Sequence, residues 1–433
     1  MPYVRPILWD IYEEHLDEAA FLWGQWERAM DSANYTLDEV IDGPEERLRA
    51  HLDGLVLGGK PVAEKLLIPA LADEDDGKVT AAAWALLQAE DADRLDLVFQ
   101  ALESAGTKEA RAALSRAFEL AERPDLVARL RPRLEASASG VQAVIVDVIA
   151  ARTGLPGPQG ADGGLPFETF LRSRNLELLA ATLRALGRAP DPRYVSFVEQ
   201  PLASPYVAVR DAAIEAGLRL GMRSARTACG KLVARNAAGA RLPLAVLALS
   251  GEQVDVATLI RKLEVQPMRR EALWALGFAG TAQAAEALLP WMGDPEVSKV
   301  AGESFATITG ARIAGALATV GQTDNGPLPA SPDEEAAPLP VVLPEDGLAS
   351  PRADRLSVWW GKASGRFAPG ARYLFGQPLS AESLRAAISA GPTWRRRAWN
   401  LDLSAQSADA APLCGWARRE RAPGPPRGHV TVR

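Results

Sequence analysis

A glycine that recurs at nearly constant spacing constrains the fold of this chain more than any other feature. Gly221, Gly251, Gly280 and Gly310 follow one another at intervals of 30, 29 and 30 residues, and Gly187 and Gly154 precede them at intervals of 34 and 33. Glycine is common in this sequence, so the spacing alone is weak evidence of a repeat, and the residues at fixed distances from each glycine support it. Five residues before each of the last four glycines stands an apolar residue: Ala216, Val246, Ala275 and Phe305. Eight residues after three of the glycines stand Val195, Leu259 and Leu288.

Apolar columns on both sides of a helix-ending glycine predict two antiparallel helices in each repeat. Residues 266–310 show one such unit, with a first helix ending at Gly280 and a second ending before the turn at Asp294-Pro295. One helix pair cannot cover its own apolar face, so neighbouring pairs must stack. The pattern therefore predicts an all-α solenoid, which we expect to be right-handed with about seven helix pairs.

Changes in composition divide the chain into five predicted segments. Residues 1–61 form an N-terminal helical cap, and residues 62–320 form the repeat solenoid with a Gly/Pro-rich insertion at 154–165. Residues 321–350 are rich in proline and acidic residues and lack lysine and arginine, which predicts an extended, solvated linker. Residues 351–412 regain apolar and aromatic residues and predict a C-terminal helical segment, and residues 413–433 predict a disordered tail.

The N-terminal cap begins with a strongly amphipathic helix over residues 7–31. Thr36 and Glu39 have the spacing of a capping box, and a second helix follows with Leu48, Leu52 and Leu55 on one face. A terminal repeat that closes the core explains this cap, since repeat arrays need one. The alternative is a docking surface built on Trp23 and Trp26.

The turn that opens several repeats resembles a known repeat family. Ser204-Pro205-Tyr206-Val207 and Asp294-Pro295-Glu296-Val297 occupy matching positions. In this the sequence resembles the HEAT-like repeat superfamily, particularly the short bacterial repeats first noted in phycobilin lyases, over residues 60–320. The stretches LWDIYEEHLDEAAFLW and EERLRAHLDGL also look like an uncharacterised bacterial HEAT-repeat family met near type VI secretion genes. That second resemblance implies an accessory or adaptor role and transfers no catalytic residue.

Overall composition restricts the compartment and the class of partner. The net charge of −7 argues against nonspecific nucleic-acid binding. Cys229 and Cys414 lie far apart without metal-ligand spacing, which favours a reducing compartment. The N-terminus lacks a signal-peptide pattern, and no apolar run approaches the ~20 residues that span a bilayer. We therefore expect a cytoplasmic protein without membrane insertion.

No residue pattern predicts a catalytic, metal or cofactor site. His15 and His51 stand near carboxylates on two helices and could bind a metal if those helices packed face to face, but no third ligand follows at zinc spacing. A Gly-x-Ser-x-Gly motif does not occur, and Cys229 in an apolar helix is more typical of a buried thiol than of a nucleophile. An enzymatic site assembled from distant helices stays open.

Two groups of residues are candidate binding surfaces. Eleven residues before the repeat glycines stand Arg210, Ala240, Arg269 and Lys299, so stacking places three basic residues along one edge. Such a row either pairs with carboxylates or helix-end carbonyls of neighbouring repeats, with Asp294 as one such partner, or forms a docking strip for an acidic partner. The second group is aromatic. Trp274 stands in a mixed column, which predicts either partial exposure on the inner helix row, where solenoids bind ligands, or ordinary packing between repeats. Trp359 and Trp360 open the C-terminal segment.

These patterns favour a non-catalytic protein-binding scaffold or adaptor. The resemblance to the family met near type VI secretion genes implies an accessory or chaperone-like component of a bacterial secretion system. The rival is a nucleic-acid-binding or DNA-repair protein, since HEAT-like folds also serve there. Its support in the sequence is the run Arg395-Arg396-Arg397 and scattered arginines. The aromatic residues of 351–412 also predict that this segment docks back onto the solenoid.

Overall fold

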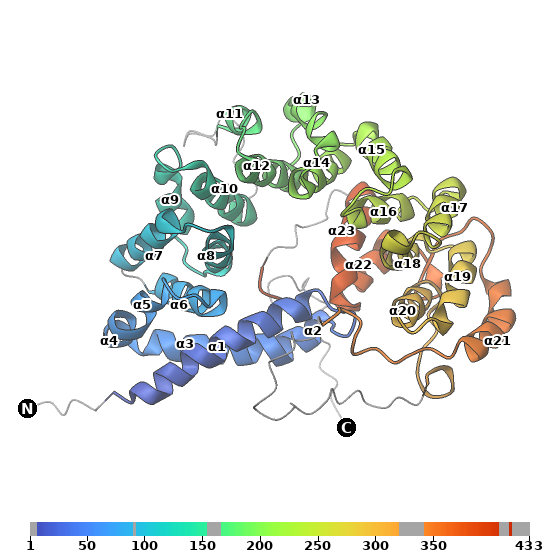
Figure 1. Cartoon of the computed structure of the whole chain (residues 1–433), viewed down its shortest axis with the longest axis horizontal. Coiled ribbons are helices and arrows are strands. Elements are labelled where there is room, and N and C mark those ends of the chain that lie inside the picture. The colour runs from blue at the N-terminus through green and yellow to red at the C-terminus, as the bar shows by residue number, and fades with distance from the viewer. Residues whose placement is uncertain (1–6, 90–91, 154–165, 320–341, 407–414, 418–433) are drawn as a thin grey trace, which may run out of the picture. The chain divides into compact units, whose positions relative to one another are not determined.

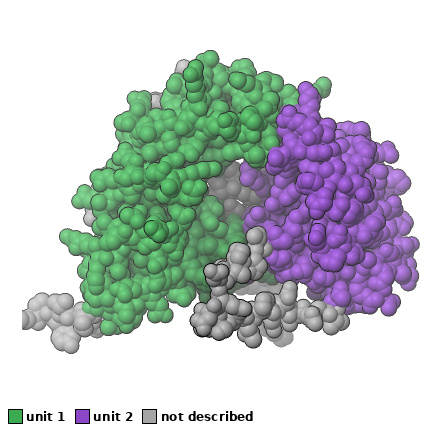
Figure 2. Space-filling view, viewed as in Figure 1, with its two compact units in different colours: residues 1–30, 36–225, 411–433 green, residues 31–35, 226–410 purple. Residues whose placement is uncertain are grey.

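A computed structural model describes residues 7–89, 92–153, 166–319, 342–406 and 415–417. The chain is an all-α helical repeat protein, so the predicted fold class is confirmed. It divides into two compact units, coloured separately in Figure 2. Unit 1 comprises residues 1–30, 36–225 and 411–433, and unit 2 comprises residues 31–35 and 226–410.

Unit 1 consists of helices that stack in sequence order (Figure 1). Its elements are α1 (Trp9–Met30), α2 (Leu37–Val40), η1 (Ile41–Glu45), α3 (Glu46–Leu57), α4 (Gly59–Val62), η2 (Ala63–Leu67), α5 (Ile68–Ala70), α6 (Asp76–Gln88), α7 (Ala92–Ser104), α8 (Lys108–Leu120), α9 (Leu126–Leu130), η3 (Arg131–Arg133), α10 (Ser139–Thr153), α11 (Phe167–Leu171), α12 (Leu176–Arg188), η4 (Pro192–Tyr194), α13 (Val195–Val198), η5 (Pro201–Ala203) and α14 (Val207–Arg219). Helices α6, α8, α10, α12 and α14 form one row in which each helix packs on the next. The capping box predicted at Thr36 and Glu39 is present at the start of α2.

Helix α15 (Arg223–Ala234) crosses from one unit into the other, and unit 2 continues from there. Its elements are α16 (Arg241–Ala248), α17 (Gln253–Lys262), α18 (Gln266–Ala279), α19 (Ala282–Leu288), η6 (Leu289–Gly293), α20 (Ser298–Thr309), η7 (Gly315–Leu317), α21 (Ala353–Ala363), η8 (Ser364–Arg366), β1 (Tyr373–Leu374), β2 (Gln377–Pro378), α22 (Ala381–Ala390), η9 (Thr393–Arg395) and α23 (Arg396–Gln406). Helices α16, α18 and α20 pack in a row, with α17 and α19 between them in sequence. None of the described helices has both the length and the apolar character of a membrane span.

The repeat glycines have a shared backbone conformation. Gly221, Gly251, Gly280 and Gly310 all have positive φ, between 63° and 72°, which side-chain-bearing residues rarely adopt. Gly187 differs because it lies inside α12, where a Cβ atom would stand 3.5 Å from the backbone of Ala216. Four of the periodic glycines therefore end helices or turns, whereas Gly187 lies at the contact between α12 and α14, where a Cβ atom would make an ordinary van der Waals contact.

The β-hairpin formed by β1 and β2 covers the C-terminal ends of two repeat helices in unit 2. The N–H of Tyr373 donates to the carbonyl of Gly280 at 2.7 Å, and the N–H of Phe375 donates to the carbonyl of Thr307 at 2.6 Å. The last carbonyls of a helix have no partner within the helix, so the hairpin satisfies them. A Cβ atom at Gly280 or Gly310 would come within 2.6 Å of a hairpin carbonyl, which explains why glycine fits at both positions.

The predicted solvated linker is wrong for the part that the structure describes, residues 342–350. Glu345 is 2% exposed and forms an ion pair with Arg270 of α18. The carbonyl of Pro344 accepts a hydrogen bond from the N–H of Ala33 at 2.9 Å. These residues pack within unit 2 because the half-buried Arg270 offsets the cost of burying the Glu345 carboxylate. Residues 320–341 lie outside the described part of the chain, as does the insertion at 154–165.

The C-terminal helices of unit 2 pack on the repeat helices through a buried arginine. Arg395 is fully buried, and its Nε donates to Glu303 of α20 at 2.7 Å while Nη1 donates to the carbonyl of Trp274 in α18 at 3.0 Å. Arg396 is also buried. Two members of the run Arg395-Arg396-Arg397 are thus structural, and only Arg397 is exposed, so the run does not form a continuous basic surface.

The predicted tail, residues 413–433, contains a buried element. Trp416 and Ala417 are fully buried within unit 1. The expectation of disorder is therefore wrong for these two residues, because an indole this large is stabilised by a pocket that excludes water. Residues 418–433 lie outside the described part of the chain.

Candidate functional site

The structure places Trp274 in the interior of unit 2. It is 7% exposed, so of the two alternatives the partial exposure is wrong and Trp274 is packed in the interior. The ring of Trp394 lies 6.2 Å from the Trp274 ring, and the guanidinium of Arg241 lies 4.3 Å from it. Side chains of the C-terminal segment cover the position, and repeat periodicity alone could not show this.

Trp359 and Trp360 lie on α21 and both contact Phe305 of α20, with ring centroids 5.9 and 5.6 Å apart respectively. Trp360 is buried, and its Nε1 donates to Glu286 at 3.4 Å. Trp359 is half-buried. The pair therefore joins α21 to the repeat helices, and only Trp359 keeps appreciable access to solvent.

Each member of the predicted basic row has a partner within its own unit. Arg210 is buried and pairs with Asp211 at 3.0 Å. The Nε of Arg269 donates to the carbonyl of Leu263, at the end of α17, at 2.9 Å. The Nζ of Lys299 donates to the carbonyl of Asp346 at 2.7 Å. These bonds favour the structural interpretation of the row over the docking strip.

His15 of α1 and His51 of α3 meet on one side of the N-terminal cap. Their Nδ1 atoms are 3.1 Å apart, and a Cβ atom at Gly54 would contact the His15 ring at 2.9 Å, so the glycine makes room for it. Burial lowers the pKa of His51, and the neighbouring His15 lowers it further. Within the described residues no group of three or more histidine, cysteine, aspartate and glutamate side chains could hold a metal ion. The pair by itself lacks a third ligand.

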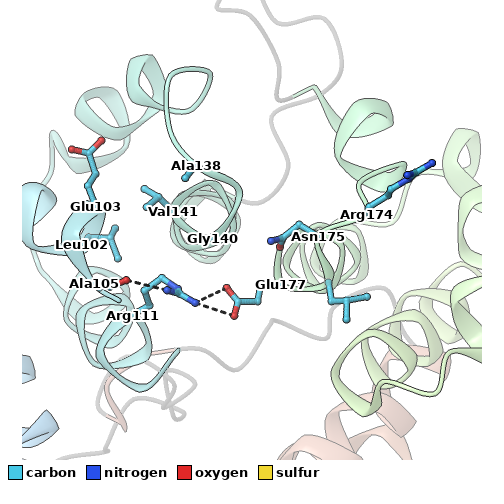
Figure 3. Close-up of a pocket in the computed structure, with 11 residues that line it drawn as sticks. Leu102, Glu103, Ala105, Arg111, Ala138, Gly140, Val141, Arg174, Asn175 and Glu177 are labelled. Carbon is cyan, nitrogen blue, oxygen red and sulfur yellow. Dashed lines mark hydrogen bonds and ion pairs between the residues drawn. The ribbon is translucent and has the colours of Figure 1, made fainter. Parts of the chain in front are cut away.

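A cleft of about 510 Å³ opens in unit 1 among the ends of α7, α8, α10 and α12. Figure 3 shows Arg111 of α8 and Glu177 of α12 facing each other across it. Nη2 of Arg111 lies 3.3 Å from the Glu177 carboxylate, and Nη1 donates to the carbonyl of Ala105 at 3.0 Å. A Cβ atom at Gly140 would stand 3.2 Å from Arg111, so glycine leaves room for this ion pair beside α10.

The rim of the cleft combines opposite charges with apolar surface. Glu103 and Arg174 are exposed and lie on different sides of the opening, as Figure 3 shows. Leu176 is 38% exposed, and Leu102 and Val141 complete the apolar lining. The opening of the cleft is thus bordered by side chains of both charges and by apolar side chains.

None of the residues that line the cleft belongs to a pattern that stands out in the sequence. Arg111 and Glu177 are 66 residues apart and come from repeats in which the glycine columns are weakest. Charged residues on helix surfaces are frequent, so nothing in one sequence singles out this pair. Only the stacking of α8, α10 and α12 brings the residues together.

The comparisons with known proteins add no relative from which a function could be transferred. Neither the family models nor the curated proteins that were compared give a match. The solved structure of an engineered protein aligns with 91% of this chain and 99% of its own, at 16% identity and a TM-score of 0.29. A score this low carries no argument about fold or function.

Proposed function

We propose that the chain is a non-catalytic protein-binding scaffold and that the cleft in unit 1 takes up a segment of a partner protein. The observation that carries this proposal is the rim, where the acidic Glu103 and the basic Arg174 flank exposed Leu176. A polypeptide offers both signs of charge and apolar side chains, which matches such a rim. Repeat proteins commonly bind along surfaces formed by successive repeats.

The charge balance of the cleft favours a protein over a nucleic acid. Arg111 and Arg174 are matched by Glu103 and Glu177, whereas phosphate binding requires an excess of basic side chains. The resemblance to a repeat family near type VI secretion genes suggests an accessory or chaperone-like role as the setting. We propose in addition that the chain is related to the HEAT-like repeat proteins and that it acts in the cytoplasm.

A photo-crosslinking amino acid at Leu176 of the full chain tests the proposal in its native host. Leu57, which is 84% exposed on α3 of the same unit, provides the matched control position. We expect one protein to crosslink at position 176 and not at position 57. Failure to crosslink at 176, or equal products at both positions, would contradict the proposal.

A charge reversal then links the partner to the rim. Arg174→Glu should weaken binding of the crosslinked partner roughly tenfold or more, because placing like charges together across an interface is costly. Arg172→Glu changes an exposed arginine that lies two residues away outside the cleft lining, and it should leave binding nearly unchanged. Equal effects of the two substitutions would mean that the partner responds to net charge and not to the cleft.

A further inference from the structure

Trp416 lies in a chamber of unit 1 whose walls come from distant helices. The rings of Trp23 and Trp26 on α1 and Trp84 on α6 have centroids 5.8, 5.1 and 5.9 Å from the Trp416 ring. These distances fall within the range of favourable aromatic pairs. The guanidinium of Arg49 on α3 lies 5.3 Å from the same ring, as a cation over an aromatic face. We call these four side chains, with Glu45 and the carbonyl of Leu120, the tryptophan chamber.

Two hydrogen bonds recognise the peptide that enters the chamber. Nε1 of Trp416 donates to the carbonyl of Leu120 at 3.0 Å. The N–H of Ala417 donates to Oε2 of Glu45 at 2.6 Å. Leu120 ends α8, where carbonyls lack helical partners, and Glu45 is fully buried. The Leu120 carbonyl and Glu45 Oε2 therefore accept from a tryptophan indole N–H and from the backbone N–H of the residue that follows the tryptophan.

The hydrogen-bond acceptors of the chamber are anchored independently of Trp416. Nε1 of Trp26 donates to Oε2 of Glu45 at 3.0 Å, and Nε1 of Trp84 donates to the carbonyl of Leu120 at 3.2 Å. The walls thus hold both acceptors in place through residues 26–120 alone. Buried Nε1 of Trp23 has no acceptor among the described residues, so the chamber retains a donor for a carbonyl of a longer peptide.

The position after the tryptophan accepts only a small side chain. Ala417 is fully buried, directly beside the bond from its own N–H to Glu45. A larger residue there would have to displace the chamber walls, because buried sites of this kind are closely packed. The sequence that fits is a tryptophan followed by alanine or a residue of similar size.

We infer that the tryptophan chamber is a peptide-binding site for a tryptophan followed by a small residue, and that Gly415–Ala417 is its intramolecular, exchangeable ligand. Because the ligand and the site share one chain, a peptide added from outside competes with an effective concentration on the order of millimolar. The segment thereby keeps the chamber closed to other peptides until it is released. This inference is independent of the cleft between α7 and α12.

The first test uses the full chain with a protease cleavage sequence in place of residues 408–413, cut after folding. The probe is a fluorescent peptide with the sequence of residues 413–420 and serine in place of Cys414. We expect the cut protein to bind the probe about 100-fold or more tightly than the uncut protein does, because cutting removes the intramolecular competitor. The same probe with alanine in place of Trp416 should not bind measurably.

Equal probe binding before and after cutting would overturn the inference, as would a segment that never exchanges after dilution. Unfolding of unit 1 when the peptide leaves would show that Trp416 is a permanent part of the core. Growth of dimers with concentration, abolished by Trp416→Ala, would assign the ligand to a second copy and overturn the intramolecular assignment.

A second measurement keeps the test decisive when removal of the indole weakens folding. The full chain with Trp416→Ala leaves an indole-sized space, and N-acetyl-tryptophanamide should raise its Tm in proportion to the logarithm of the ligand concentration. N-acetyl-alaninamide is the matched control and should have no effect. A Trp416→Ala chain whose Tm responds to neither compound, or that neither compound allows to fold, would overturn the inference.

Discussion

Replacement of Arg395 by methionine tests whether a buried ion pair fixes the C-terminal helices of unit 2. Arg395 is fully buried, Glu303 is 9% exposed, and the guanidinium also donates to Ser304 Oγ at 2.7 Å. Methionine fills similar volume but leaves Glu303 buried without its cation. Breaking a buried pair in this way costs about 3–5 kcal/mol. For a unit of this size a urea m-value of about 2–3 kcal/mol/M converts that cost to a midpoint lower by about 1–2.5 M.

Urea unfolding of the full chain, followed by tryptophan fluorescence and circular dichroism, measures this shift. Arg397→Met is the control, because Arg397 is exposed two positions away and should change stability by about 1 kcal/mol or less. Adding Glu303→Gln to Arg395→Met removes the stranded charge and should recover about 1–3 kcal/mol through coupling between the two sites. A single variant within about 0.5 kcal/mol of the native chain, as surface substitutions are, would refute the argument. Strict additivity in the double variant would refute it as well.

Three further outcomes follow from the structure. Lowering the pH below 6.5 should destabilise unit 1. Burial and the adjacent His15 lower the pKa of His51 in the folded state, so the unfolded chain binds the proton at a higher pH than the folded chain does. His51→Gln should reduce the dependence of the urea midpoint on pH. Gly280→Ala should lower Tm more than Gly221→Ala. In both variants alanine must adopt a positive φ, which costs about 1–2 kcal/mol, but only at position 280 would its Cβ also stand 2.6 Å from a backbone carbonyl. Equal shifts in Tm would argue against docking of the hairpin on Gly280. Arg269→Ala should clearly lower the unfolding midpoint, because it removes the hydrogen bond to the Leu263 carbonyl and the contact of the guanidinium with the Trp291 ring 4.4 Å away. An unchanged midpoint together with weaker partner binding would favour the docking strip instead.

The helices of the repeat region were predictable because their signal is local. Four of the glycines that define the period have positive φ, and the apolar columns around them are buried, as at Leu276 and Phe305. Helix propensity, capping and amphipathic spacing act over a few residues, and a single sequence contains all of this information. The capping box at Thr36 and Glu39 is predictable for the same reason.

The contacts that join distant segments were not predictable in this way. Arg395 belongs to a run of three arginines, a pattern typical of an exposed charged surface. In the structure it is buried because it pairs with Glu303, which lies 92 residues earlier in the chain. Trp416 lies in a Pro- and Arg-rich stretch typical of disorder, while its acceptor Leu120 lies 296 residues away. Compositional signals describe the average of a segment, whereas one buried side chain depends on a pocket made elsewhere. The candidate cleft shares this property, because its ion pair spans two non-adjacent helices.

The order in which the units are completed has a consequence for synthesis on the ribosome. Unit 1 receives its helices by Ala225, but Trp416 emerges roughly 190 residues later, which at about 5–20 residues per second is a delay of about 10–40 s. During that interval the nascent chain presents three wall tryptophans without their indole ligand. Unit 2 is completed in the opposite order, because residues 31–35 are synthesised before any of the helices with which they pack. The interval between the synthesis of Ala225 and that of Trp416 is therefore the period in which the rate of translation can affect the completion of unit 1.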